Sequence, residues 1–352
     1  MNPAETAVES AGEPARSRPV LRGDVSDRDR HYGVFYGVAP LPGDADSSGD
    51  AGAGDAVPRV VVVGNCQAES LRIVLESSGD IQSFRVPPIH EWETRDMPFV
   101  EFAMQWANVL VTQPVRNDYR GLPCGTEQLS SLMRTDGSPT HVLRYPVLRF
   151  SALNPRWAIV RSPLDSSLSP PVVPYHDLHL IAQLAGLQQV NEPDYQGIVE
   201  ANVQLMAARE GAHGTVGMST YLRELPEWHT LNHPNNATLA ELGTRVMQAI
   251  RECEPAWENL NGQVSAPIVR EMLGHLRSPV DPRALEALGL PASDRSEWTL
   301  HGEVIPAEEI EAAHRSFYRE HPEFIDAALK RHADLFHLLG FSSPAEAGAQ
   351  NS

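Results

Sequence analysis

The residues best suited to chemistry are Gly64, Asn65, Cys66 and Gln67, which directly follow a run of valines at 60–63. A continuous β-branched run predicts a strand buried on both faces, and the apolar residues after Cys66 recur at helical spacing. The pattern therefore predicts a strand, a tight turn and a helix, with the cysteine on the turn. Backbone N–H groups at a helix N-terminus stabilise a thiolate, so we expect a low thiol pKa and a nucleophile at Cys66.

The same turn offers donors for a developing oxyanion. Backbone N–H groups there would be joined by the side-chain amides of Asn65 and Gln67, and Gly64 would permit a close approach. This is the logic of a nucleophile elbow, although the G-x-S-x-G pattern is absent here. The alternative is that Cys66 is a free cysteine buried as a small hydrophobic side chain.

A thiol nucleophile needs a base, usually a histidine, but 14 histidines make chance proximity uninformative. His233 lies between Asn232 and a proline that would hold it at a rigid corner before a predicted helix. Its alternative role is that of a loop histidine beside an asparagine helix cap. His176 is the second candidate, next to Asp177, which alternatively caps the helix that follows. His90 is a third and weaker candidate.

Composition excludes several classes of protein. Lys and Arg number 28 against 46 Asp and Glu, and the net charge of −18 argues against a nucleic-acid binder and a polybasic membrane anchor. The three cysteines include no close pair, which excludes a disulfide scaffold and a thiolate zinc site. The HExxH and phosphate-loop motifs are absent, so no metal site is expected and a nucleotide triphosphatase or Rossmann dehydrogenase is disfavoured.

Targeting signals are also missing from the sequence. The N-terminal residues do not read as a secretory signal, and no apolar run approaches the ~20 residues that span a bilayer. Reduced cysteines fit the cytoplasm. We therefore expect a soluble cytoplasmic protein without membrane insertion.

The periodicity along the chain predicts the fold class. Buried strands are expected at 60–63, 107–112, 141–145 and 157–160. Helices dominate after about residue 176, among them two in the last third, at 303–320 and 323–339. The expected class is α/β: a small mainly parallel sheet with a cysteine-bearing strand, turn and helix, followed by a predominantly helical C-terminal half.

Several of these motifs occur in an order associated with one family. They are Gly64-Asn65-Cys66-Gln67, Gln113-Pro114 with Tyr119, Tyr145-Pro146, Tyr175-His176-Asp177 and Leu231-Asn232-His233-Pro234-Asn235. Over roughly residues 59–245 the chain resembles the WcbI-like polysaccharide-biosynthesis proteins, proposed acetyltransferases that bind coenzyme A. The resemblance implies acyl transfer from acetyl-CoA, as co-substrate, to a sugar hydroxyl in surface-polysaccharide or related glycan assembly.

The resemblance also implies roles for single residues. Cys66 would be the nucleophile or the thiol that contacts the acyl group. His233 is preferred as the base over His176, which is considered together with Asp177. The groups that would orient the substrate or hold the oxyanion are Asn65, Gln67 and Asn232.

Because CoA is an anion, an acidic protein needs a local basic site to bind it. The expected CoA-binding residues are Gly64, Arg72, Gln113 and Arg116. Further cations near the motifs are Arg120, Arg144, Arg149, Arg156 and Arg161. Each of these arginines is also compatible with ordinary surface charge.

The expected domains are a largely disordered tail at 1–57, a WcbI-like catalytic domain at 58–265, a helical extension at 266–342 and a disordered tail at 343–352. Within the first tail, an aromatic segment at 31–37 either docks on the folded body or acts as a lid or partner contact. Expected partners are a small-molecule acyl donor and a sugar acceptor, and the oligomeric state is left open. Two other functions are also open: a cysteine-dependent esterase or thioesterase, and a non-catalytic CoA- or glycan-binding module.

Overall fold

The computed structural model describes residues 18–21, 23–43, 57–165 and 167–342. The predicted disorder at 343–352 and over most of the tail at 1–57 therefore concerns residues outside the described ones. Among the described residues, no helix has both the length and the apolar character that a membrane crossing requires.

A four-stranded parallel sheet forms the centre of the N-terminal half, in the order β2-β1-β3-β4. Its strands are β1 (Arg59–Val63), β2 (Gln82–Ser83), β3 (Val109–Thr112) and β4 (His141–Arg144). In the register of β1 and β3, Val60 pairs with Val109 and Val63 with Thr112. The predicted parallel sheet is thus confirmed, with the valine run as an interior strand.

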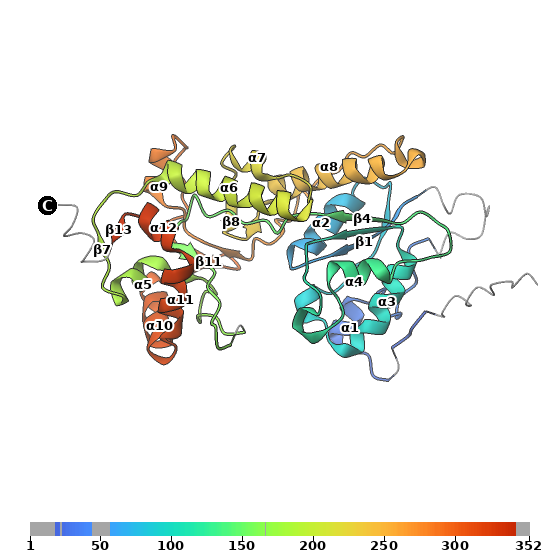
Figure 1. Cartoon of the computed structure of the whole chain (residues 1–352), viewed down its shortest axis with the longest axis horizontal. Helices are drawn as coiled ribbons and strands as arrows, with labels where there is room; N and C mark the ends of the chain where they lie inside the picture. The colour runs from blue at the N-terminus through green and yellow to red at the C-terminus, as the bar shows by residue number, and fades with distance from the viewer. Residues whose placement is uncertain (1–17, 22, 44–56, 166, 343–352) are drawn as a thin grey trace, which may run out of the picture.

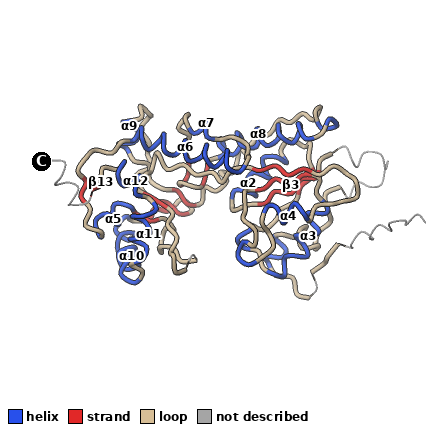
Figure 2. Tube along the Cα trace, in the orientation of Figure 1, coloured by secondary structure: helices blue, strands red, loops and turns tan. Residues whose placement is uncertain are grey.

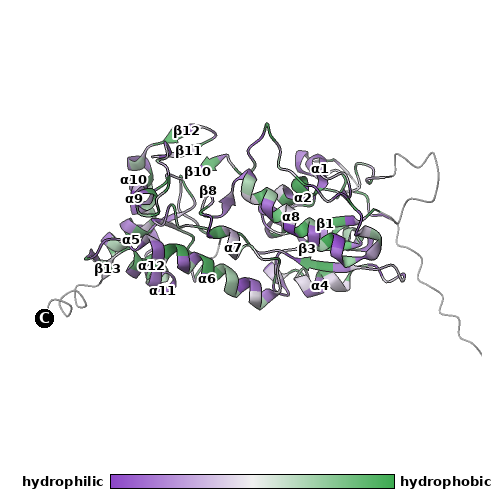
Figure 3. Cartoon of the chain, turned by 90° about the horizontal axis from the view of Figure 1, so that it is seen from above, coloured by the Kyte–Doolittle hydropathy of each residue, from purple (hydrophilic) through white to green (hydrophobic). Residues whose placement is uncertain are grey.

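Helices cover both faces of this sheet (Figure 1). One face carries α2 (Gln67–Glu76) and α8 (Asn236–Cys253), and the other carries α3 (Met97–Trp106) and α4 (Thr126–Ser131). Alternate residues of β1 point to opposite sides: Val62 packs in the cluster that contains α2 and α8, and Val61 in the cluster that contains α3. Figure 3 shows α8 running along α2.

The aromatic segment at 31–37 packs on the α3 face. It follows α1 (Asp27–His31), and Tyr32, Phe35 and Tyr36 are all buried there, in one cluster with α3. The Tyr36 hydroxyl donates a hydrogen bond to Asp96 Oδ1 at 2.9 Å. Arg28 donates to the same hydroxyl, so the contact combines apolar burial with a charged network.

The C-terminal half is predominantly helical, as expected (Figure 2). Its helices are α5 (Leu178–Leu184), α6 (Tyr195–His213), α7 (Ser219–Leu222), α9 (Pro282–Ala287), α10 (Ala307–Glu320), α11 (Glu323–Arg331) and α12 (Ala333–Leu338). A 3-10 turn of this half is η5 (Pro255–Trp257); in the N-terminal half the described residues also form η2 (Ile89–Glu91), η3 (Thr94–Asp96) and η4 (Tyr119–Gly121).

Short antiparallel pairings tie the helices together. They are β5 (Trp157–Ala158) with β6 (His176–Asp177), β8 (Trp228–Thr230) with β9 (His233–Pro234), β10 (Leu276–Arg277) with β11 (Trp298–Leu300) and β12 (Glu303–Ile305), and β7 (Gln188–Gln189) with β13 (Phe341–Ser342). Three predictions were wrong in detail. The strand expected at 157–160 is two residues long, and the helix expected from 303 begins at 307 because 303–305 form a strand. The single helix expected at 323–339 is divided at His332 into α11 and α12.

Candidate active site

Cys66 lies at the corner between β1 and α2, where the sequence places it. It is the N-cap of α2, with helical φ and ψ of −55° and −19°, and its side chain caps nothing. Asn65 supplies the cap instead: its Oδ1 accepts the N–H of Gln67 at 2.9 Å, and its carbonyl accepts the N–H of Ala68 at 2.9 Å. The cysteine side chain is thereby left available at a corner whose backbone is fixed by its neighbour.

The Gln67 side chain joins this corner to two distant segments. Its Nε2 donates to the carbonyls of Leu148, at 2.9 Å, and Asn232, at 2.8 Å. Its Oε1 accepts the N–H of Leu148 at 3.1 Å and an N–H of Gln113 at 3.2 Å. Gln67 is fully buried and all its polar atoms are engaged, so it positions the corner and does not serve as the oxyanion donor expected from the sequence.

Gln113 and Gly64 complete the packing behind the corner. Gln113 is buried, and its Oε1 accepts the N–H of Asn65 at 2.9 Å. A Cβ on Gly64 would lie only 2.9 Å from the Gln113 amide and would overlap the Tyr145 hydroxyl. Both residues, expected to bind CoA, are therefore occupied with internal packing.

The segment that carries Asn232 and His233 is held by a second set of hydrogen bonds. Tyr175 donates its hydroxyl proton to Asn232 Oδ1 at 2.7 Å, and the same hydroxyl lies 2.8 Å from Thr230 Oγ1. Since the Asn232 carbonyl accepts from Gln67, both ends of Asn232 are fixed. The side-chain oxygen of Asn232 is therefore already in use.

The pKa of the Cys66 thiol differs from the expectation. Burial raises the pKa of the Cys66 thiol, and the backbone N–H groups of Cys66 and Gln67, which act in the opposite direction, do not outweigh it. The predicted low pKa is therefore wrong. The N–H groups of Gln67 and Ala68 donate to Asn65, and the sulfur itself is largely enclosed. At neutral pH the sulfur is protonated and needs a base to become a nucleophile.

His233 has the protonation state that such a base requires. Burial, and secondly the neighbouring His275, lower the pKa of His233 to about 4, so its ring is neutral at pH 7. Its Nδ1 is buried and has no hydrogen-bond partner among the described residues. The His233 and His275 ring centroids are 5.5 Å apart.

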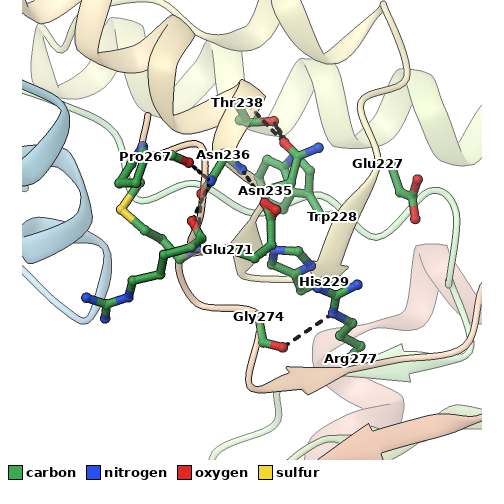
Figure 4. Close-up of polar contacts among 12 residues, drawn as sticks. Glu227, Trp228, His229, Asn235, Asn236, Thr238, Pro267, Glu271, Gly274 and Arg277 are labelled. Carbon is green, nitrogen blue, oxygen red and sulfur yellow. Dashed lines mark hydrogen bonds and ion pairs between the residues drawn. The ribbon is translucent and has the colours of Figure 1, made fainter. Parts of the chain in front are cut away.

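The rest of the Asn-His-Pro-Asn motif anchors a loop (Figure 4). Asn235 caps α8 by accepting the Thr238 N–H at 3.0 Å. Asn236 donates to the carbonyls of Pro267 and Arg270 at 3.0 and 2.8 Å, and its backbone N–H donates to Glu271 at 3.2 Å. Asn236, which directly follows the motif, therefore fixes the loop at 267–271 next to the segment that holds His233.

His176 and Asp177 lie in a different environment. His176 is 1% exposed, its Nδ1 is 3.0 Å from the Tyr318 hydroxyl, and its ring stacks on Phe324. Asp177 caps α5 through the N–H groups of its first turn and forms an ion pair with Arg156. None of these contacts involves Cys66, so we retain His233 and not His176 in the proposed site.

The two expected CoA-binding arginines differ in availability. Arg72 is paired with Glu69 and Glu76, at 2.8 Å in each case, so its charge is already neutralised. Arg116 lies exposed on the loop after β3. No group of three or more His, Cys, Asp or Glu residues suited to a metal ion occurs in the described part of the chain.

Two tyrosines near the thiol were not among the predicted site residues. Burial is the main cause that raises the pKa of Tyr145 and of Tyr175, and in both the proximity of Cys66 adds to the increase. Both tyrosines belong to motifs that carry the resemblance, Tyr145-Pro146 and Tyr175-His176-Asp177, but no role at the site was expected of either. Only their contacts in the fold distinguish them from other tyrosines.

Fold and site together define an α/β protein with a protonated cysteine at a strand–helix corner and a neutral histidine on a segment tied to that corner. A family model described as polysaccharide biosynthesis enzyme WcbI matches residues 59–252. The chain belongs to this family. A solved structure of WcbI, described as a novel polysaccharide biosynthesis enzyme, shares the fold with a TM-score of 0.63 at 17% identity, covering 80% of this chain and 98% of that one. No curated protein sequence matches the chain.

Proposed function

We propose that the protein is an acyl-CoA-dependent acyltransferase, in the simplest case an acetyltransferase, that acylates a sugar hydroxyl in surface-polysaccharide or related glycan assembly. Family membership supports the biosynthetic role. The solved WcbI structure is described as the native protein without a disulfide bond between CoA and one of its cysteines. That description supports CoA as the acyl carrier and a cysteine as its neighbour.

The observation that carries the proposal is the double hydrogen bond of Gln67 to Leu148 and Asn232. Cys66 directly precedes Gln67, and His233 directly follows Asn232. One buried amide therefore holds the thiol and the imidazole segments together, although they are far apart in sequence. This is the positioning that a nucleophile and its base require.

In the first proposed step, the neutral His233 ring takes the proton of the Cys66 thiol as sulfur attacks the thioester carbonyl. The backbone N–H of Cys66, which lies against the sulfur, is the proposed donor for the oxyanion, since the N–H of Gln67 already donates to Asn65. When the tetrahedral intermediate collapses, the bond between the carbonyl carbon and the CoA sulfur breaks. The imidazolium returns its proton to the CoA thiolate, and the acyl group remains on Cys66.

In the second step, the same imidazole removes the proton of the sugar hydroxyl, whose oxygen attacks the acyl-enzyme. The carbon–sulfur bond to Cys66 breaks, and the thiolate takes the proton back from His233. The products are a sugar ester and the original thiol. Water in place of the sugar would make the protein a thioesterase.

The test compares Cys66→Ala with Cys253→Ala, a cysteine on α8 outside the site. Release of free CoA thiol from acetyl-CoA is followed with and without sugar acceptors, and intact mass reports an acetylated protein. We expect sugar-dependent release in the wild type and in Cys253→Ala, and none in Cys66→Ala. Full transfer by a folded Cys66→Ala protein would refute cysteine catalysis.

The same assay separates the alternatives. CoA release that does not depend on any sugar would indicate a hydrolase. Tight CoA binding with no release under any condition would indicate a binding module. Either result would contradict the proposed transfer reaction.

A further inference from the structure

A cavity in the C-terminal half is lined by residues of α6, of the α11–α12 corner and of the segment at 149–159. Its volume is about 430 Å³, which is within the range of small-molecule sites. Apolar side chains form most of its wall, including those of Trp157, Ile198, Met206 and Leu335. Leu205, on α6, also lines it and is 52% exposed.

Three arginines line this cavity: Arg149, Arg209 on α6 and Arg331 on α11. No ion pair or side-chain hydrogen bond engages their guanidinium groups within the described residues, and Arg149 Nε is buried without a partner. Burial, followed by the charges of Arg209 and Arg331, lowers the pKa of Arg149 to about 10. One carboxylate, Asp334, also lines the cavity but forms no ion pair with them.

Several arginines elsewhere in the described chain have a carboxylate partner. The chain has 46 acidic residues against 28 basic ones, and partners for an arginine are abundant. Arg72, Arg156 and Arg223, for example, each pair with a carboxylate. Three mutually repelling guanidinium groups without a partner therefore indicate a place for a ligand's negative charge.

The cavity lies close to the candidate active site. Arg149 follows Leu148, and Leu231 of the cavity precedes Asn232; Leu148 and Asn232 are the two residues that Gln67 holds. Arg149 and Arg209 also line an adjoining cavity of about 230 Å³ beside Pro114 and Pro146, at the carboxyl edge of the sheet. Arg149 and Arg209 therefore line both cavities, and Arg331 lines only the larger one.

The geometry points to a phosphate-binding site at Arg149, Arg209 and Arg331, with the apolar wall taking the group to which the phosphate is attached. Guanidinium groups bind phosphate oxygens bidentately and stay charged, which suits them to this task better than lysine. The phosphate has two possible sources: CoA, or a phosphorylated sugar acceptor. The CoA source rests on the proposed function, whereas the binding site itself does not.

The test measures binding by calorimetry with three probes: CoA, 3′-dephospho-CoA and glucose 1-phosphate. The variants are Arg209→Gln and Arg331→Gln, which remove charge from partly or fully exposed side chains and leave the core intact. Arg319→Gln, an exposed arginine of α10 outside the cavity, is the matched control. We expect at least one probe to bind about 10-fold or more weakly to both cavity variants and normally to the control.

Loss of CoA affinity would identify CoA as the source, and comparison with 3′-dephospho-CoA would show whether the 3′-phosphate is the group bound. Loss confined to glucose 1-phosphate would identify the acceptor. The inference is overturned if all probes bind both cavity variants within twofold of the wild type, or if no probe binds the wild type. Binding is also measured in Cys66→Ala, so a failed catalytic proposal and a failed cavity proposal give different results.

Discussion

Gln67→Met is the substitution that examines the site most directly. Methionine has a similar volume and helix preference, so it leaves no cavity and does not disturb α2. It removes two N–H donors and one acceptor from a fully buried position. The groups left behind are the carbonyls of Leu148 and Asn232, the N–H of Leu148 and one N–H of Gln113.

Each buried polar group that loses its partner costs about 1–3 kcal/mol. Four groups at the low end give about 4 kcal/mol, which we take as the expected loss in the free energy of unfolding because such costs are not strictly additive. Activity falls as well, since the segment with His233 is no longer held against the corner with Cys66. A misplacement of about 1 Å costs about 100-fold in rate.

The assay is urea denaturation of the wild type and of Gln67→Met, together with the rate of CoA release. Gln248→Met is the matched control, because Gln248 lies on the surface of α8 and its amide donates to Glu252, with no other hydrogen-bond partner among the described residues. We expect the control to change stability by less than about 0.5 kcal/mol. Equal stability and equal turnover in the two variants would refute the positioning role of Gln67.

Three further predictions follow from the packing. Burial, then His314 and His332, lower the pKa of His176 to about 3 from 6.5, so its contribution to stability is present above about pH 6.5 and is lost as the pH falls towards 3. In His176→Phe, the slope of unfolding free energy against pH in that window is smaller by up to about 1.4 kcal/mol per unit, and an unchanged slope would contradict this. Tyr36→Phe removes a buried hydrogen bond to a carboxylate, so we expect it to lower the free energy of unfolding in urea by about 1–3 kcal/mol. The control is Tyr32→Phe, which should cost less because the Tyr32 hydroxyl has no partner in the described structure. Equal losses in the two variants would contradict the docking contact. Gly64→Ala should lower the free energy of unfolding by about 1–3 kcal/mol, because the added methyl group overpacks against Tyr145. Adding Tyr145→Phe to Gly64→Ala should restore part of that stability. A double variant no more stable than Gly64→Ala would contradict this geometry.

The sheet could be predicted because its signal is local. A run of valines with no polar residue is typical of a strand covered on both faces. The helical spacing of the apolar residues at 68–75 then predicts the corner between this strand and a helix. The short antiparallel pairs could not be predicted in this way. A two-residue strand such as His176–Asp177 exists only because Trp157–Ala158 lies beside it, and no periodicity develops over two residues.

The helix boundary at 307 has a similar explanation. Glu303–Ile305 pairs with Trp298–Leu300, and Pro306 then begins the helix as its N-cap. Glu303 favours a helix by local preference, whereas the β-branched Val304 and Ile305 favour a strand, and the pairing partner decided between them. Pro306 was a further local sign of the boundary.

The candidate site shows the same division between local and tertiary information. Sequence spacing placed Cys66 on a corner and Asn232 and His233 on a turn, but it suggested that Gln67 and Gln113 point to a ligand. In the structure both side-chain amides form hydrogen bonds that join segments of the chain. Whether a buried amide serves the ligand or the fold depends on which backbone groups need partners, and those are known only when the chain is folded.

The protonation states at the site constrain the order of events. A buried thiol with a raised pKa and an imidazole with a pKa of about 4 are both neutral at pH 7, so a resting thiolate–imidazolium pair is disfavoured in this environment. In the proposed reaction, proton transfer becomes favourable only when the sulfur forms its bond to a carbonyl and the negative charge passes to an oxygen beside the N–H of Cys66. Under this proposal, the desolvation that makes Cys66 a weak nucleophile at rest couples its activation to the presence of the acyl donor. A cavity lined by unpaired arginines next to this site, in a chain of charge −18, would bring an anionic donor or acceptor to it against the overall field of the protein.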